Sequence, residues 1–448
     1  MSNRLAARLL RIVVFIAPLV AGLPAPSASQ QTSVLTDTTI DLGPRLTLET
    51  IIARTLVHSP NLAGALGAVR DASAARRVAA VGAYLPTLVL NGITGKSAQA
   101  GGSATTGTSS SAQSGYGVGV AALVDVFTGG RRGAQRTQAN ALVRSASAGL
   151  VLQRYGTILT ATQGYLDMLR AHELSRVAAD HVAQAALGLD FALRREAAGA
   201  GMRADVLSAQ LALSTARQAQ LAASDTLTMN AAALGRLVGA DGPVDAQPSI
   251  ALDPTPLPLS DAEVIALAVA SAPAVLATQA QASADTAGVR AAKSLYLPTI
   301  AAGGGYNWGS STAFSSGLRP GWIVELTTSF PLFDGFLREQ SVTQAEVASE
   351  VATTTALDTR RLVSSTAVAL LGNLHVAEHD IELTRESVQL ATENLRVFRL
   401  RYNAGIATIL DVLTAQSSLV QAELGLVSAR FNYGSTRASL EALLGRPL

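Results

Sequence analysis

The sequence predicts a mixed α/β membrane protein built from two structural repeats, each with a strand hairpin and a long helical hairpin. Three observations lead to this prediction. Short segments recur about 206 to 213 residues later in the 448-residue chain. Two stretches, residues 131–237 and 337–444, contain no proline and only one conspicuous glycine break each. Ahead of each stretch lie glycine-rich segments whose apolar residues alternate with polar or small ones.

The repeats are visible as matching short sequence segments. LTLETIIARTLVHSPNL near the start matches LSDAEVIALAVASAPAV in the second half, AYLPT returns as LYLPT, and VFTGG corresponds to LFDGF. Self-similarity at a fixed offset indicates a duplicated structural unit. We therefore expect a first repeat over residues 31–241 and a second over residues 259–448. The proline-rich residues 242–258 between them predict an extended linker.

Each proline-free stretch predicts a helical hairpin, over residues 131–238 and 336–446. Apolar residues keep spacings of three and four over several heptads, which indicates coiled-coil packing. A helix over residues 337–402 would be roughly 100 Å long at 1.5 Å per residue. Gly199 and Gly405 interrupt the pattern, and glycine readily takes the left-handed conformation that ends a helix. We expect the hairpin tips at residues 199–205 and 405–411.

The strand hairpins are expected at residues 86–126 and 298–333, each after a short helix. The glycine-, serine- and threonine-rich residues 95–113 are expected to form the loop of the first hairpin. Trp322, Val324, Leu326, Thr328 and Phe330 alternate with other residues over a length that suits a tilted outer-membrane strand. An ordinary soluble hairpin is the alternative.

Aromatic residues near the strand ends fit the membrane interpretation, because tyrosine and tryptophan collect at membrane–water interfaces. The expected interface aromatics are Tyr116, Tyr306, Trp308 and Trp322. Four strands cannot close a barrel, and an open sheet leaves unpaired backbone groups in lipid. If these strands enter a bilayer, several chains must share one barrel.

Residues 1–30 predict a secretory signal peptide, with cleavage at about residues 25–31. Arg4, Arg8 and Arg11 precede an apolar run, and small residues follow it. The whole chain carries a net charge of +2, and these three arginines leave the remaining chain near −1. A basic nucleic-acid-binding surface is therefore not indicated. The chain has no cysteine, which excludes disulfides, cysteine–zinc sites and a lipid-modified cysteine.

The repeat, YLPT before each strand hairpin, PLFDG after the second one and YNAGIATILDVLTAQ near the C-terminus together resemble the TolC-like outer-membrane efflux proteins. The resemblance covers nearly all of the mature chain. It implies a homotrimer with a twelve-stranded barrel in outer-membrane lipid and a coiled-coil tunnel in the periplasm of a Gram-negative bacterium. It also implies a periplasmic adaptor and an inner-membrane pump of the resistance-nodulation-division, ABC or major facilitator type. No cofactor is implied.

The resemblance also assigns site residues. Gly199 and Gly405 match the turns where adaptor hairpins dock, and Asp205 and Asp411 match acids near the entrance constriction. Tyr402 matches a tyrosine in the bonds that hold the entrance shut. Ala407 stands where better-known members have an arginine, and Arg203 is a candidate replacement for it. Thr414 stands where some members have a second acid.

Simpler interpretations compete with these roles. Thr408 followed by Asp411 resembles a capping box, so Asp411 is expected to cap a helix wherever the helix lies. Asp205 has Met202 in place of the matching threonine, and capping explains it less well. Tyr402 has the spacing of a coiled-coil core residue. Its role in closing the entrance and its role in the core both stay open.

The function that the resemblance implies is an outer-membrane channel-tunnel, the passive exit duct of a tripartite efflux or type I secretion system. Two other function classes compete with it. The HVAEH sequence at residues 375–379 fits an H-x-x-E-H metallopeptidase pattern, with Glu378 as the base. The pattern is absent from the matching place in the first repeat, so we predict neither a metal site nor catalytic residues. A secreted coiled-coil scaffold or adhesin is the second alternative, but it leaves the strand hairpins and the tip turns unexplained.

Overall fold

The structure is a computed structural model that describes residues 42–101, 109–249, 253–310 and 319–448. The predicted signal peptide, residues 1–30, lies outside the described residues. The first repeat contains α1 (Leu48–His58), α2 (Pro60–Ala80), β2 (Thr87–Gly101), β3 (Ser109–Phe127), α3 (Arg131–Ala197) and α4 (Arg203–Val238). The second contains α5 (Asp261–Ser271), α6 (Pro273–Lys293), β5 (Thr299–Ser310), β6 (Arg319–Ser329), α7 (Leu337–Asn403) and α8 (Ile409–Leu444).

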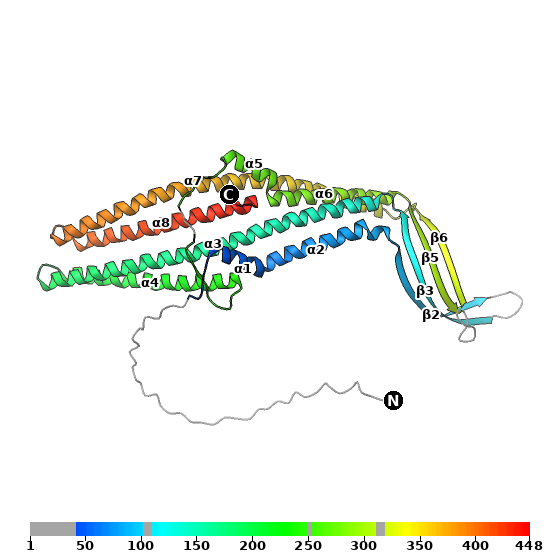
Figure 1. The fold of residues 1–448 in the computed structure, drawn as a ribbon, viewed down its shortest axis with the longest axis horizontal. Coiled ribbons are helices and arrows are strands. Elements are labelled where there is room, and N and C mark those ends of the chain that lie inside the picture. Colours follow the sequence, from blue (N-terminus) through cyan, green and yellow to red (C-terminus); the bar gives the residue numbers. More distant parts are fainter. Residues whose placement is uncertain (1–41, 102–108, 250–252, 311–318) are drawn as a thin grey trace, which may run out of the picture. The chain divides into compact units, whose positions relative to one another are not determined.

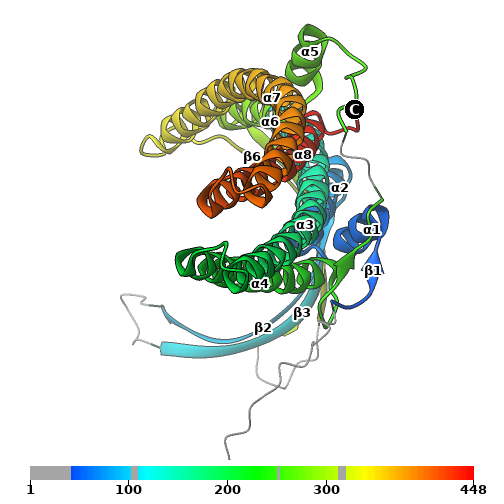
Figure 2. The ribbon, with the colours of Figure 1, turned by 90° about the vertical axis from the view of Figure 1, so that its left-hand side faces the viewer.

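The two repeats have helical hairpins of equal length. Helices α3 and α7 each contain 67 residues, and α4 and α8 each contain 36. At 1.5 Å per residue the longer helices reach roughly 100 Å. Figure 1 shows both hairpins with their turns at the same end of the bundle and the strands at the opposite end. Figure 2 shows the helix pairs arranged side by side along an arc.

The hydrophobic core follows the repeat. In the first repeat, α1 packs on α3 and α4 through a cluster that includes Ile51, Tyr165 and Leu234. In the second, α5 packs on α7 and α8 through a cluster that includes Val264 and Leu374. Helix α6 lies between α3 and α7 and joins the two halves. The core therefore lies mainly at mid-length of the helices.

The strands form one antiparallel sheet in the order β2-β3-β5-β6. The expected loop at residues 95–113 is partly wrong, because β2 continues to Gly101 and β3 begins at Ser109. Backbone groups form the ladder between them, from Gly95 opposite Gly115 to Gly101 opposite Ser109, so the small polar side chains do not end it. Strand β6 ends at Ser329, before Pro331, and Phe330 lies outside the strand that was expected to contain it.

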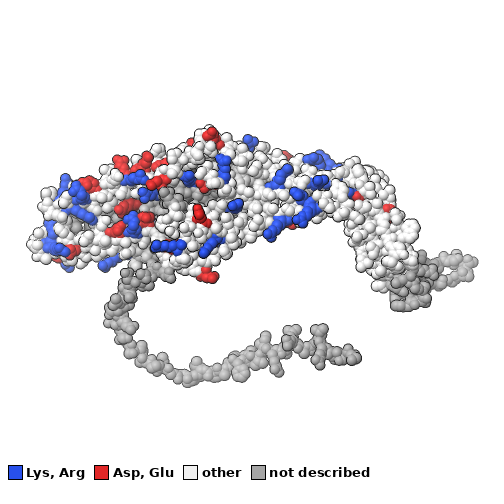
Figure 3. Space-filling model, viewed as in Figure 1, with Lys and Arg blue, Asp and Glu red and all other residues white. Residues whose placement is uncertain are grey.

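The register gives the two faces of the sheet different chemistry. Opposite residues of antiparallel strands point to the same face. Leu90, Val120, Tyr306 and Trp322 lie opposite one another in successive strands and share one face. The strongly exposed residues of that face are Leu88, Leu90, Trp322, Val324 and Leu326. In the view of Figure 3 the charged residues gather over the helices and are sparse over the sheet.

The opposite face of the sheet is more polar. Asn91, Asn307, Glu325 and Thr327 lie on it, beside glycines and aliphatic residues. Glu325 lies across the neighbouring strand, because its Cγ would be 3.2 Å from a Cβ placed on Gly303. The sheet therefore has one apolar face and one face with polar and acidic groups.

Within the described residues, one helical stretch has the length and composition of a membrane span. It is Asp261–Tyr296, with a mean hydropathy of 1.5 in its most apolar window. The backbone leaves the helical conformation at Ala272, where ψ is 135°, so the stretch consists of two helices, α5 and α6. Helix α6 packs against α3 and α7. These contacts identify α6 as one of the packed helices of the bundle.

Candidate functional site

The candidate site is the pair of helical turns at the end of the bundle that lies away from the sheet (Figure 1). Gly199 and Gly405 have φ of 70° and 75°, the left-handed conformation that closes a helix C-terminus. The chain then folds back on the helix end, since Ala200 N donates to Arg195 O and Ile406 N donates to Arg401 O, each at 2.9 Å. Both interruptions are tight turns between antiparallel helices.

The second turn starts α8 with a complete capping box. The Thr408 hydroxyl accepts a hydrogen bond from Asp411 N, and Thr408 N donates to Asp411 Oδ2 at 2.8 Å. The backbone hydrogen bond, followed by the one from the Thr408 hydroxyl, lowers the pKa of Asp411. Asp411 is therefore a helix-capping residue in this chain, whatever further role it has.

The first turn has no such cap. Met202 precedes α4 and makes no side-chain cap bond, so Asp205 is not part of a capping box. Arg203 pairs with Glu196 of its own hairpin, with its Nη1 3.5 Å from Glu196 Oε2. This pair bridges the two helices of one turn. Within the described part of the chain, Arg203 makes no hydrogen bond or ion pair with the other hairpin.

Tyr402 is the centre of the contact between the two hairpins. It is 4% exposed and packs in a cluster with Leu395, Ile409 and Val412. Phe191 of α3 lies against it, with the ring centroids 5.6 Å apart. Tyr402 is therefore a core residue, as its spacing predicts. Its contact with Phe191 also connects the two hairpins.

A cation that the sequence analysis did not single out completes this contact. Arg195 of α3 donates from Nη1 to the backbone oxygen of Tyr402 at 2.7 Å and from Nη2 to Ala200 O at 3.0 Å. Its guanidinium carbon lies 4.6 Å from the centroid of the Tyr402 ring, a cation–π distance. We call Arg195, Phe191 and Tyr402 the hairpin latch.

The Tyr402 hydroxyl is buried and makes no hydrogen bond within normal geometry to any described residue. Burial raises the pKa of Tyr402, and the nearby carboxylate of Asp205 raises it further, while Arg195 opposes both effects. Asp205 acts on the hydroxyl mainly through its charge, with a smaller contribution from hydrogen bonding. The structure brings together Asp205 and Tyr402, whereas Asp411 caps its own helix and Arg203 pairs within its own hairpin.

Three of the expected interface aromatics, Tyr306, Trp308 and Trp322, lie on one face of the sheet. Tyr306 lies opposite Trp322, and the rings of Tyr306 and Trp308 are in edge-to-face contact at 4.6 Å. Tyr116 lies opposite Ser310 in the ladder, and its side chain is outside the described part of the chain. Tyr306, Trp308 and Trp322 lie in the halves of β5 and β6 that are away from the helices, and β2 and β3 continue beyond them to Gly101 and Ser109.

The HVAEH histidines have ordinary surface surroundings. His375 Nε2 lies 3.6 Å from Asp261, and His379 Nδ1 lies 3.8 Å from Glu382. Over the described ranges, no group of three histidine, aspartate or glutamate side chains could hold a metal ion.

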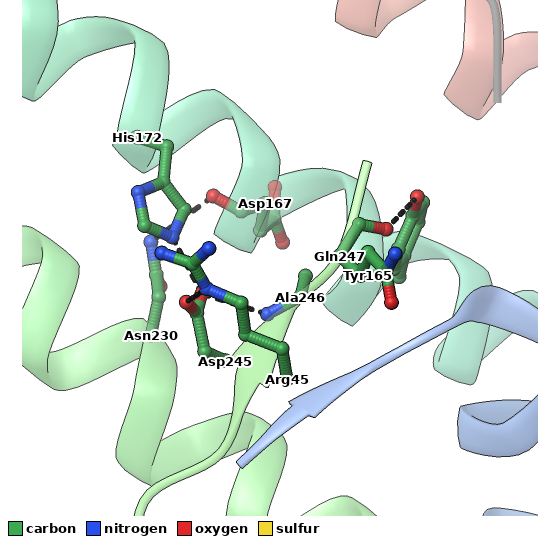
Figure 4. Close-up of polar contacts among 8 residues, drawn as sticks. All are labelled: Arg45, Tyr165, Asp167, His172, Asn230, Asp245, Ala246 and Gln247. Carbon is green, nitrogen blue, oxygen red and sulfur yellow. Dashed lines mark hydrogen bonds and ion pairs between the residues drawn. The ribbon is translucent and has the colours of Figure 1, made fainter. Parts of the chain in front are cut away.

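A second polar cluster lies at mid-length of the bundle (Figure 4). The buried carboxylate of Asp245 accepts from Arg45 Nε at 2.9 Å and lies 2.5 Å from His172 Nε2. Asp245 belongs to β4 (Asp245–Ala246), which pairs in parallel with β1 (Arg45–Leu46). Tyr165 of α3 donates to Gln247 O at 2.8 Å. These contacts fasten the start of the linker to α3.

Sequence comparisons agree with this geometry. A family model described as outer membrane efflux protein matches residues 51–240 and 264–446, one segment in each repeat. Protein CyaE of Bordetella pertussis is 29% identical over 421 residues, which cover 90% of this chain and 84% of CyaE. Outer membrane protein TolC of Escherichia coli is 28% identical over 122 residues, 27% of this chain and 25% of TolC.

Solved structures share the fold over most of the chain. The outer membrane protein VceC of Vibrio cholerae superposes with a TM-score of 0.76 at 19% identity, covering 89% of this chain and 96% of VceC. A membrane protein from Pseudomonas aeruginosa gives 0.77 at 20% identity, with 89% and 93% covered. CusC gives 0.76 at 18% identity, with 89% and 92% covered. At these identities the likeness establishes the fold.

Proposed function

Because the chain belongs to the outer membrane efflux protein family, we propose that it is the exit duct of a tripartite efflux system or a type I secretion system. Family membership assigns it to the outer membrane of a Gram-negative bacterium, with the helices extending into the periplasm. In the proposed role it conducts substrates passively from an inner-membrane pump to the exterior. The pump supplies both the energy and the choice of substrate.

The sheet is the observation that carries this proposal. Its apolar face presents Trp322, Val324 and Leu326 at exposures of 77%, 76% and 71%, which suits contact with lipid. Its edge strands, β2 and β6, pair with no further strand within the described ranges of the single chain. Unpaired backbone groups are not tolerated in lipid, so the edges must pair with further copies. Three chains would then complete a twelve-stranded barrel with the polar face inside.

The helices support the same assembly. Helix α7 exposes Val376, Leu383 and Leu390, at a spacing of seven residues and exposures of 59%, 61% and 65%. Apolar residues at heptad spacing pack against a neighbouring helix in a coiled coil. A second copy of the chain is the natural partner for this stripe. The homotrimer would extend the barrel as a helical tunnel.

We assign the closing of the periplasmic entrance to the hairpin latch. Arg195 and Tyr402 connect the turn of one hairpin to the last turn of α7 in the other, and Asp205 places a charge beside them. Opening requires the two hairpins to separate, which breaks these contacts. The turns at Gly199 and Gly405 are the proposed docking points for a periplasmic adaptor, since nothing covers them in the described chain.

Two measurements on the purified mature protein test the proposed function. Light scattering in detergent should give the mass of a trimer, and planar bilayers should show a small, cation-preferring conductance. A protein that stays soluble and monomeric without detergent would refute the duct and favour the secreted scaffold. Trimers that insert but never conduct, even after the latch is weakened, would refute passive conduction alone.

A further inference from the structure

A groove of about 230 Å³ lies beside the latch, between α3 of one hairpin and α7 and α8 of the other. Leu187 and Phe191 line it from α3, and Ile409 and Val412 line it from α8. These four side chains give it an apolar wall. Its volume is slightly below the ~300 Å³ at which drug-sized sites begin, so a small ligand is indicated.

Polar groups without partners also line the groove. The Tyr402 hydroxyl is buried and makes no hydrogen bond of normal geometry to a described residue, although the Asp205 carboxylate and the Arg195 guanidinium lie near it. Gln416 is 4% exposed, and its side-chain amide makes no hydrogen bond to another described residue. Buried polar groups in native proteins almost always have partners, and an unpaired one costs about 1–3 kcal/mol. One such group, the Tyr402 hydroxyl, beside the Gln416 amide in an apolar groove indicates a site for a ligand with polar atoms.

The charge at the groove is positive. Arg399 lines it and donates only to Gln184 Oε1, at 3.3 Å, and no carboxylate pairs with it in the described chain. Burial lowers the pKa of Arg399, which reflects the lack of a compensating anion. Asp205 and Arg195 are the charged groups beside Tyr402, and they offset each other. An anionic group on the ligand would therefore be favoured.

We propose that this groove binds a small amphipathic organic anion, with its apolar body against Phe191 and Val412 and its carboxylate against Arg399 and Gln416. The ligand would fill the space between the two hairpins and tie them together. Its occupancy would then favour the closed entrance. The binding itself stands on the groove alone, and the effect on closing rests on the proposed function.

The test uses naphthoate as the probe, with the full-length mature protein in nanodiscs. Isothermal titration calorimetry against empty nanodiscs separates binding from partition into lipid. We expect saturable binding with one site per chain, and at least tenfold weaker binding by Arg399→Gln, because a charge-assisted bond is lost. Arg396→Gln is the matched control. Arg396 lies one turn earlier on α7 and pairs with Glu393 on the surface.

Neutral naphthylmethanol and cationic naphthylmethylamine should bind more weakly than naphthoate. The site would be overturned by equal binding of all three probes, by equal binding to wild type and Arg399→Gln, or by the absence of saturable binding. Saturable binding would also be absent if a neighbouring copy of the chain fills the groove. In bilayers, naphthoate should lengthen closed times of the wild type but not of Arg399→Gln. A protein without conductance would refute the duct, while calorimetry would still decide the groove.

Discussion

Replacing Arg195 by glutamine tests the hairpin latch directly, because the side chain crosses from one hairpin to the other. The change removes the bond to the Tyr402 backbone oxygen and the cation–π contact with its ring. The bond to Ala200 O lies within the first hairpin, so we expect it to persist when the two hairpins separate. Only the first two contacts therefore favour the closed state.

The size of the effect follows from these two contacts. A hydrogen bond from a charged donor contributes about 1.5–3 kcal/mol, and a cation–π contact contributes about 0.5–2 kcal/mol. Arg195 is partly exposed, so solvent reduces both, and we expect about 1.4 kcal/mol per protomer. This free energy shifts the ratio of closed to open hairpins about tenfold. Three protomers that open together would give about a thousandfold shift.

The assay is the open probability of single channels in a planar bilayer at neutral pH. Arg194→Gln is the matched control, since Arg194 is adjacent in sequence, 77% exposed, and paired at 2.7 Å with Asp190 of its own helix. Arg195→Gln should open the channel much more often, and Arg194→Gln should behave as the wild type. Equal behaviour of the two variants would refute the latch and leave Arg195 as a local helix-end residue.

Four further predictions follow from the described contacts. Burial raises the pKa of Tyr402, so the closed state binds the hydroxyl proton more tightly than the open state. The fraction of open channels should therefore increase as pH rises above about 10. Tyr402→Phe should remove that pH dependence in the same recordings. Thr408→Ala should destabilise the first turn of α8 by about 1 kcal/mol, seen as faster amide hydrogen exchange there, and unchanged exchange would contradict the cap. Glu325→Gln should lower cation preference measured by reversal potential, whereas Thr327→Val on the same face should not. Phe336, with φ of 67°, occupies the position in the second repeat that Gly130, with φ of 83°, occupies in the first. A side chain is unfavourable in this left-handed conformation, so Phe336→Gly should raise the free energy of unfolding by about 1 kcal/mol and Gly130→Ala should lower it. Denaturation in detergent measures both changes.

Much of the helical architecture could be predicted from the sequence, because its signals are local. Missing prolines permit long helices, and Gly199 and Gly405 end them with a positive φ. The strand ends could not be predicted. The continuation of β2 to Gly101 depends on pairing with Ser109 and its neighbours across the hairpin, and side-chain type carries little of that information.

The candidate site divides in the same way. The Thr408–Asp411 box is a short-range pattern, and the structure forms it. The bond from Arg195 to Tyr402 joins residues 207 positions apart. Arg194 and Arg195 look alike in sequence, and they differ only in the side of α3 that each occupies. Arg194 pairs with Asp190 on the exposed surface of α3, and Arg195 points toward the second hairpin. Only the packing of the two hairpins distinguishes them.

The latch also changes how the missing arginine at position 407 should be understood. Ala407 cannot supply a cation to the second turn, and Arg203 is engaged with Glu196. Arg195 brings a guanidinium to Tyr402 from the opposite hairpin, and it binds the backbone oxygen of that residue as well as the ring face. The backbone bond does not depend on the tyrosine hydroxyl. Removing that hydroxyl should therefore weaken the closed state far less than removing the Arg195 guanidinium. If the hydroxyl held the two hairpins together, removing it would instead have the larger effect.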